Sequence, residues 1–125
     1  MNEYYKIGRL RMPVARKIGV RCADICINRN HLSHIAHVHA TELAQLGVSA
    51  MDYVSMIASR YNMIMQGSGN SLLLVVYRGE SNDVAAIDLD YSTKKGFWEV
   101  KTAQPRRYEE IVKRKKLWQS CPSSQ

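Results

Sequence analysis

All four histidines of this 125-residue chain lie within nine consecutive positions: His31, His34, His37 and His39. Histidine is the side chain whose ordinary pKa is nearest neutral pH, so one cluster can supply both a proton acceptor and a proton donor. Three interpretations stay open: a zinc site, a set of structural histidines, and acid–base chemistry on a phosphodiester. In the second, His39 is a hydrogen-bonded core residue and the others are solvated.

The zinc interpretation has the weakest pattern. His31, His34 and His37 recur at three-residue steps, whereas zinc sites on one helix more often use an i, i+4 pair with a distant ligand. No Cys-x-x-Cys motif completes a ligand set. We therefore expect neither a metal nor a cofactor.

A second group with chemical potential lies in the segment Phe97–Thr102, whose alternation predicts a strand. The expected faces are Trp98, Val100 and Thr102 on one side, and Phe97, Glu99 and Lys101 on the other. Glu99 and Lys101 on one face would join an acid–base group to a charge that stabilises phosphate. The alternative is a solvated ion pair, which contributes little energy.

Positive charge is concentrated at the two ends of the chain. The net charge is +7, with +5 on residues 1–21 and +4 on residues 105–125. Basic ends around a near-neutral middle predict a phosphate-binding rim, although solubility alone would also explain them. The candidate nucleic-acid-binding residues are Arg9, Arg11, Arg16, Tyr77, Arg78, Arg106 and Arg107.

Apolar spacing predicts the elements that position these groups. A strand is expected over Arg21–Asn28, followed by a helix that Asn30 caps and Gly47 ends. Helical projection places His39 in the apolar stripe of that helix and His34 outside it. A second helix is expected to begin at Ser49 and to continue to about Tyr61.

The second half of the chain changes to a period of two residues. Four strands are expected at Met63–Gln66, Ser71–Arg78, Val84–Tyr91 and Phe97–Ala103, with hairpin-length connections that require an antiparallel meander. Arg106–Gln119 is expected to form a basic amphipathic helix, and residues 1–19 to be irregular. The predicted fold class is α+β: a strand, two helices, a four-stranded antiparallel meander and a C-terminal basic helix.

The length predicts a single domain, 1–125, with a basic N-terminal segment (1–20), a core (21–105) and a basic C-terminal helix and tail (106–125). The longest apolar run, Leu72–Tyr77, is far shorter than the roughly 20 residues that span a bilayer. The first residues lack the apolar stretch of a secretory leader, so we expect a cytoplasmic protein.

Three sequence marks occur in a fixed order between about Asp24 and Pro105. They are His34-Ile35 followed by His39, the helical stretch LGVSAMDYVSMIASRYNMI, and the strand that ends Val100-Lys101-Thr102-Ala103. This succession resembles the phage and mobile-element branch of the barnase–EndoU–colicin–RelE-like (BECR) nuclease superfamily. The resemblance implies two helices packed on a four-stranded antiparallel meander.

The resemblance also implies an activity, which is metal-independent cleavage of RNA by the ribose 2′-OH. The implied catalytic residues are His34, His39, Lys101 and Thr102, with His31 in reserve. The implied partners are RNA, including ribosome-associated RNA or tRNA, and an acidic inhibitor protein. The alternative is a non-catalytic basic module that binds nucleic acid, or a phage or mobile-element accessory protein that retains the fold.

Overall fold

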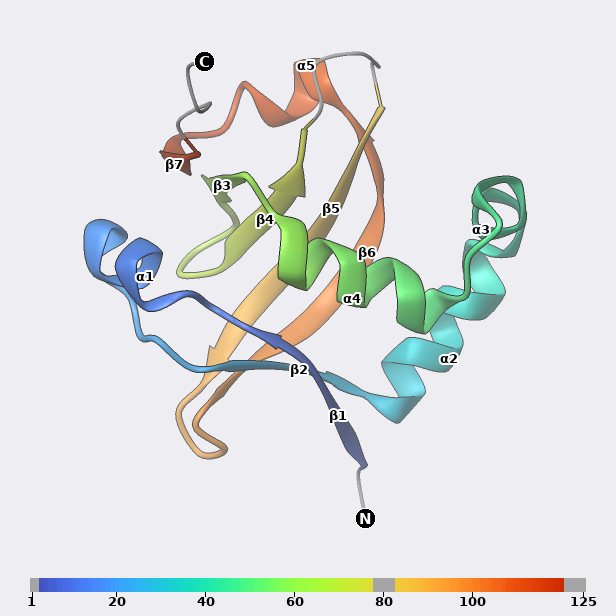
Figure 1. Ribbon diagram of the computed structural model, residues 1–125, viewed down its shortest axis with the longest axis horizontal. Helices are drawn as coiled ribbons and strands as arrows, with labels where there is room; N and C mark the ends of the chain where they lie inside the picture. Colours follow the sequence, from blue (N-terminus) through green and yellow to red (C-terminus); the bar gives the residue numbers. More distant parts are fainter. Residues whose placement is uncertain (1–2, 78–82, 121–125) are drawn as a thin grey trace.

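The computed structural model describes residues 3–77 and 83–120. In these ranges the chain forms seven strands and five helices (Figure 1). In chain order they are β1 (Tyr4–Arg9), α1 (Met12–Ile18), β2 (Asp24–Asn28), α2 (Arg29–Val38), α3 (Ala40–Leu46), α4 (Ala50–Arg60), β3 (Met63–Gln66), β4 (Leu72–Val76), β5 (Asp83–Ser92), β6 (Phe97–Arg107), α5 (Tyr108–Ile111) and β7 (Lys116–Gln119).

The seven strands form one mixed sheet in the order β1-β2-β6-β5-β4-β3-β7. Strands β3 to β6 are the expected antiparallel meander, but they are only the centre of the sheet. Strand β2 adds to β6 in parallel, β1 adds to β2, and β7 adds to β3. The predicted architecture of one strand, two helices, a four-stranded antiparallel meander and a C-terminal helix is therefore wrong. The described ranges form a seven-stranded mixed sheet and five helices, still of the α+β class.

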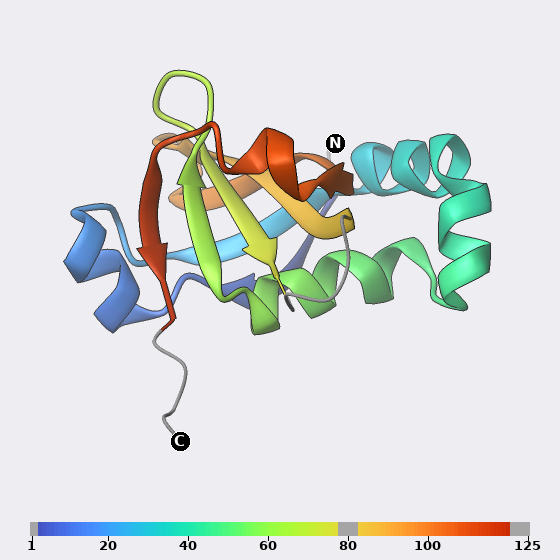
Figure 2. The same ribbon diagram turned by 90° about the horizontal axis from the view of Figure 1, so that it is seen from above.

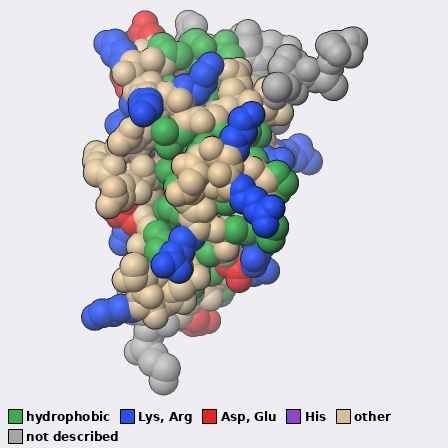
Figure 3. Space-filling model, turned by 90° about the vertical axis from the view of Figure 1, so that its left-hand side faces the viewer, with side chains coloured by type: hydrophobic (Ala, Val, Ile, Leu, Met, Phe, Trp, Pro, Cys, Tyr) green, Lys and Arg blue, Asp and Glu red, His purple; other side chains and the backbone are tan. Residues whose placement is uncertain are grey.

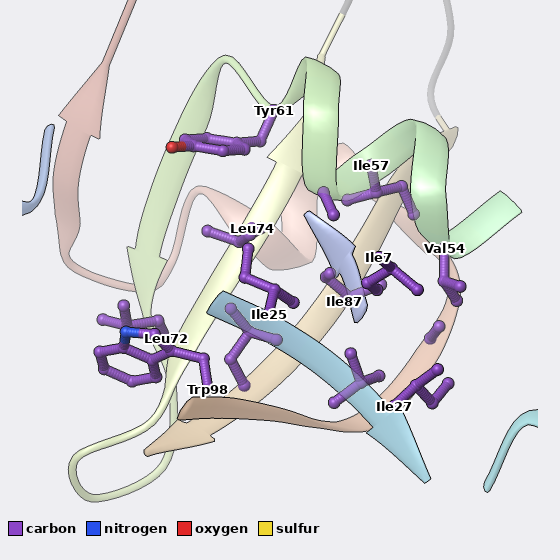
Figure 4. Close-up of a cluster of buried hydrophobic side chains, with 14 of the residues drawn as sticks. Ile7, Ile25, Ile27, Val54, Ile57, Tyr61, Leu72, Leu74, Ile87 and Trp98 are labelled. Carbon is purple, nitrogen blue, oxygen red and sulfur yellow. The ribbon is translucent and has the colours of Figure 1, made fainter. Parts of the chain in front are cut away.

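The two faces of the sheet are covered unequally, as Figure 2 shows. Helix α4 packs along one face, which we call the inner face, and short α5 lies on the opposite, outer face. The inner core joins α4 to the central strands through side chains such as Ile57, Leu74 and Ile87, which are 0% exposed (Figure 4). None of the helices in the described part of the chain has the length and apolar character that crossing a bilayer requires.

The N-terminal segment, expected to be irregular, contains β1 and α1. Tyr5 and Ile7 alternate with polar neighbours and pack against the inner core, which favours a strand despite the basic composition. Gly8 makes this packing feasible, because a Cβ at this position would lie 2.9 Å from the Cβ of Ala58 on α4. The close approach of β1 to α4 thus depends on the missing side chain.

The C-terminal basic helix is also a wrong prediction. Strand β6 continues to Arg107, α5 covers only Tyr108–Ile111, and the chain then forms β7 against the edge of β3. Pairing with β3 satisfies backbone groups that would otherwise lie at an open edge, and it packs Trp118 against the inner core. Tertiary pairing therefore overrides the amphipathic helical pattern.

The expected helix from Asn30 to Gly47 is divided into α2 and α3 at His39, whose φ and ψ are −109° and 27°. The N-cap is Asn28 rather than Asn30: its side chain accepts the backbone N–H of Asn30 at 2.7 Å. Gly47 ends α3 at φ 70°, as predicted. Ser49 caps α4 by accepting the N–H of Asp52, which confirms that prediction.

Candidate active site on the outer face of the sheet

Glu99, on β6, is the focus of a group of charged and polar side chains on the outer face. Its side chain is only 10% exposed, a degree of burial that glutamate rarely shows unless it is paired. The surrounding groups are Tyr4 from β1, His31 from α2, Lys95 from the β5–β6 turn and Lys101 from β6. We call these five residues the Glu99 cluster.

The two carboxylate oxygens of Glu99 face different partners. Oε1 lies 3.7 Å from Nζ of Lys95 and 3.9 Å from Nζ of Lys101. Oε2 accepts a long hydrogen bond from the Tyr4 hydroxyl at 3.5 Å and lies 4.0 Å from Nδ1 of His31. The carboxylate thus has a cationic side and a side with two groups that can exchange protons.

Sheet pairing explains why these distant residues meet. The parallel pairing aligns Cys26 of β2 with Glu99 of β6. Helix α2 starts directly after β2, so its first turn lies beside β6 and carries His31 to Glu99. Antiparallel pairing of β1 with β2 then places Tyr4 opposite Asn28, on the same side.

A β-bulge sets the position of Lys101. Asp88 pairs with Thr102 and Leu89 pairs with Val100, which leaves Lys101 as the extra residue of β6. The bulge turns Thr102 to the outer face, where its hydroxyl donates to Asp88 at 3.1 Å. The predicted strict alternation, with Thr102 beside Trp98 and Val100, is therefore wrong after Val100.

Lys95 and Tyr4 form one unit at the edge of the cluster. Nζ of Lys95 donates a hydrogen bond to the Tyr4 hydroxyl and lies 4.3 Å from the centre of the Tyr4 ring. The Tyr4 hydroxyl and, more weakly, the Glu99 carboxylate raise the pKa of Lys95 against the effect of partial desolvation. Lys95 is therefore a cation at neutral pH.

His31 lies beside Glu99 without a hydrogen bond to it. Its Nδ1 is buried and has no hydrogen-bond partner among the described residues, while the side chain as a whole is 41% exposed. With Nδ1 facing Glu99, Nε2 lies at the opposite edge of the ring and is left for another partner. A shift of about 1 Å would bring Nδ1 within hydrogen-bond distance of the Glu99 carboxylate, the contact by which a carboxylate fixes a histidine tautomer in hydrolases.

An open cleft of about 490 Å³ adjoins the cluster. Glu99 and Lys101 line it, together with Asn70, Asp90, Tyr91, Ser92 and Thr93. Asp90 pairs with Glu99 across β5 and β6, and both residues line the cleft. The volume is in the range that holds a nucleotide-sized ligand, and the lining offers both donors and acceptors.

The structure separates the other histidines from this site. His34 is one turn beyond His31, is exposed, and makes no hydrogen bond or ion pair within the described residues. His39 lies at the α2–α3 junction with its side chain 19% exposed, and its Nδ1 is 3.0 Å from Oε2 of Glu42. That hydrogen bond lowers the pKa of Glu42. Among the described residues, no group of three or more His, Cys, Asp or Glu side chains is arranged to hold a metal ion.

The candidate phosphate-binding arginines lie in several places. Arg106 is half-buried, with Nη2 3.0 Å from Oδ2 of Asp88, and Arg107 is exposed, 3.7 Å from Glu109. Arg9 pairs with Asp24 at 3.1 Å, at the far end of β1. Arg16 is exposed on α1. These residues do not form one patch with the cleft.

Arg11 has a structural role instead. Its guanidinium lies 4.1 Å from the centre of the Tyr61 ring and donates to the Tyr61 carbonyl at 2.7 Å, and it also faces the Trp118 ring. It thereby connects the end of β1 to β7. Figure 3, which views the face that carries α1 and β7, shows lysines and arginines spread across it rather than gathered at one point.

Tyr77 directly follows the central strand β4 and stacks on Tyr108. Arg78 lies outside the described residues. The sequence reasoning named Glu99, Lys101 and His31 but missed Tyr4 and Lys95. The Tyr4–Tyr5–Lys6 alternation could have indicated a strand with Tyr4 on a polar face, but no pattern in the sequence shows that this strand meets Glu99.

No protein-family model, curated protein or solved structure matches this chain. The function of the Glu99 cluster is therefore inferred from its own chemistry.

Proposed function

We propose that the chain is a metal-independent ribonuclease that cleaves RNA at the Glu99 cluster. The observation that carries this proposal is the convergence of a histidine and two lysines on one buried carboxylate, beside a cleft large enough for a nucleotide. Phosphodiester transesterification needs these components: two proton-transfer groups and cations for the developing charge.

The proposed reaction uses the ribose 2′-OH as its nucleophile. Oε1 of Glu99, the carboxylate oxygen nearer Lys101, removes the 2′ proton while the O2′–P bond forms. Lys95 and Lys101 stabilise the added negative charge on the non-bridging oxygens. His31, protonated at Nε2, donates its proton to the 5′ oxygen as the P–O5′ bond breaks. The products are a 2′,3′-cyclic phosphate and a free 5′-OH.

The residue assignment differs from the one that the family resemblance implies. Lys101 and the reserve histidine, His31, remain in the proposed site. His34 and His39 leave it, since neither contacts the cluster in the described structure, and Thr102 becomes a partner of Asp88. Glu99 becomes the principal proton acceptor.

The decisive experiment incubates the purified protein, in EDTA, with a fluorescent single-stranded RNA and separately with DNA of the same sequence. We expect cleavage of RNA only, because DNA lacks the 2′-OH. Glu99→Gln and His31→Ala should each lower the rate by about 10²–10⁴-fold, the usual contribution of a general acid or base. The matched controls are His37→Ala and His39→Ala on the same helical unit, and both should retain activity.

Lysine substitutions test the charge-stabilising role separately. Lys101→Met should lower the cleavage rate, while Lys94→Met, in the exposed β5–β6 turn, should not. Cleavage of DNA at an equal rate, or full activity in the folded Glu99→Gln protein, would refute the proposal. Salt-sensitive RNA binding without cleavage would instead support the non-catalytic accessory module.

The proposal has two consequences for the biology of the chain. RNA substrates point to the cytoplasm as the place of action. A nuclease of this kind needs control, and an acidic inhibitor protein would complement the net charge of +7.

A further inference from the structure

Tyr77 and Tyr108 form a stacked aromatic pair on the outer face, at the opposite end of β6 from Glu99. Their ring centres are 4.2 Å apart and their planes differ by 10°. In Figure 1, α5, which begins with Tyr108, lies at the top of the molecule, and the β5–β6 turn lies at the bottom. Both tyrosines are partly exposed. The pair is therefore remote from the Glu99 cluster but on the same face of the sheet.

Hydrogen bonds fix the backbone of Tyr77, and both rings pack on an apolar cluster. The Asn62 side chain accepts the N–H of Tyr77 at 2.8 Å and donates to the carbonyl of Tyr77 at 2.6 Å. Below the rings lies a second apolar cluster, which consists of Met63, Met65, Leu73, Val75, Val84, Ala86 and Ile111. A rigid aromatic surface loses little entropy when a planar ligand stacks on it.

The Tyr77 ring also stays neutral. Partial desolvation and then the adjacent Tyr108 phenol raise the pKa of Tyr77 above its ordinary value. A neutral phenol does not repel phosphate. The Tyr77–Tyr108 pair is therefore compatible with a ligand that combines planar bases with a phosphate backbone.

Strand β6 joins this pair to the Glu99 cluster. Thr102, Gln104 and Arg106 pair with Asp88, Ala86 and Val84, which places them on the outer face between the two sites. Nine residues with one bulge span roughly 25–30 Å, a length compatible with a segment of several nucleotides. Polar side chains thus connect the two sites.

The charge near the pair favours a polyanion, although two arginines already have carboxylate partners. Arg106 uses Nη2 for Asp88 and Arg107 uses Nη1 for Glu109, and a guanidinium carries five N–H donors in all. The chain beyond α5 adds Lys113, Arg114, Lys115 and Lys116. These cations lead from α5 towards β7, while Glu109 and Glu110 lie in α5 itself.

We infer that Tyr77 and Tyr108 form a stacking platform for a base of single-stranded RNA, and that the RNA runs along the outer face of β6 to the Glu99 cluster. This inference rests on the proposed function for the identity of the ligand. A paired base cannot reach such a platform, because its faces are already stacked in the duplex. The platform extends the substrate contact well beyond the nucleotide that is cleaved.

The test measures affinity for a 5′-fluorescein-labelled 2′-O-methyl oligouridylate of about twelve nucleotides, which lacks the free 2′-OH and cannot be cleaved. Tyr108→Leu keeps an apolar contact but removes the flat ring, and it should weaken binding about 5- to 100-fold, the effect of one base–aromatic stack. Tyr108→Phe, the matched control, should bind as the wild type does. Equal affinity of the Leu and Phe variants would overturn the inference.

A second measurement uses the wild-type protein alone and does not depend on a variant that folds. An oligonucleotide with 2-aminopurine at successive positions should lose fluorescence at one position, where that base stacks. Unchanged fluorescence at every position, or binding of a duplex as tight as that of the single strand, would overturn the platform.

The two proposals can fail separately. If Tyr108 determines the affinity but the wild type never cleaves cleavable RNA, the platform stands and the nuclease proposal fails. If cleavage depends on Glu99 but the Tyr108→Leu and Tyr108→Phe variants bind equally, the nuclease stands and the platform fails.

Discussion

The inner and outer faces of the sheet carry different kinds of residue. The inner face, under α4, is a continuous apolar layer in which Ile57, Leu74 and Ile87 have no exposed surface. The outer face has its buried apolar cluster beneath α5 and the tyrosine pair, and towards the other end of β6 it carries Glu99, Lys101 and Asp88. The inner face therefore accounts for most of the hydrophobic stabilisation.

The comparison teaches how stability and chemistry can be separated in a small protein. Buried apolar area stabilises a fold without regard to direction, whereas a charged cluster needs exact partners and contributes little net stability. Placing them on opposite faces of one sheet lets the same strand, β6, serve both. Trp98 and Val100 face the inner core, and Glu99 between them faces the cleft.

The largest expected difference between the faces is in the free energy of unfolding. Leu74→Ala on the inner face should cost about 3 kcal/mol, because it leaves a cavity in a fully buried site. Glu99→Gln should change the stability by about 1 kcal/mol or less, since its lysine partners are solvated. Urea unfolding of both variants measures the contrast.

A larger loss of stability in Glu99→Gln than in Leu74→Ala would contradict the division between the faces. It would mean that the Glu99 cluster is mainly a structural ion-pair network.

A second prediction concerns the place where β1 meets the inner face. Gly8→Ala should cost about 1–3 kcal/mol, because its Cβ would lie 2.9 Å from the Cβ of Ala58 and 3.2 Å from the Ala58 carbonyl oxygen. Thermal unfolding measures this cost. Because β1 also carries Tyr4 of the Glu99 cluster, the proposed RNA cleavage rate should decrease together with the stability.

The double substitution Gly8→Ala/Ala58→Gly is the control for that contact. Removal of the Ala58 methyl should restore part of the stability, although glycine inside α4 costs about 1 kcal/mol by itself. Strictly additive losses would show that the close approach of β1 to α4 is not the cause.

The smallest expected effect is on the pKa of the Cys26 thiol. Cys26 is the strand partner of Glu99, aligned with it in the pairing of β2 with β6. Burial and then the Asp24 carboxylate raise the pKa of Cys26, while Lys6 opposes them. Asp24→Asn should therefore lower the pKa, and Lys6→Met should raise it. The pH dependence of iodoacetamide labelling, in a Cys22→Ser/Cys121→Ser background, measures both shifts, and shifts in the opposite directions would contradict the charge arrangement.

The same thiol links stability to pH. The folded protein keeps Cys26 protonated to a higher pH than the unfolded chain does. The stability that the protonated Cys26 thiol contributes is therefore complete below the pKa that the thiol has in the unfolded chain. It is lost as the pH rises through the pKa of the thiol in the folded protein. Outer-face charges thus influence the fold weakly but measurably.

Local patterns predicted the central part of the fold and little of its edges. Strands β3 to β6 and helix α4 follow from alternation and helical spacing, because their connections are short. The parallel pairing of β2 with β6 joins residues more than 70 positions apart, and no local pattern contains that information. The segment Arg106–Gln119 has a helical pattern, yet the open edge of β3 selects a strand for its end.

The candidate site divides in the same way. Glu99 and Lys101 could be named from their spacing on one strand, although the bulge that places Lys101 and Thr102 was not foreseen. His31 could be named only as one of several histidines, since its role comes from the start of α2 beside β6. Tyr4 and Lys95 join the Glu99 cluster only through tertiary contacts, which the sequence does not display.

The separation of Tyr4 from Glu99 by 95 positions also has a kinetic consequence. The central meander can close through short loops, but β1 and β2 must find β6 by closing a much longer one, which is slow and entropically costly. The Glu99 cluster therefore depends on contacts that close the longest loops of the sheet. The complete cluster forms only after the first third of the chain has packed against the last third.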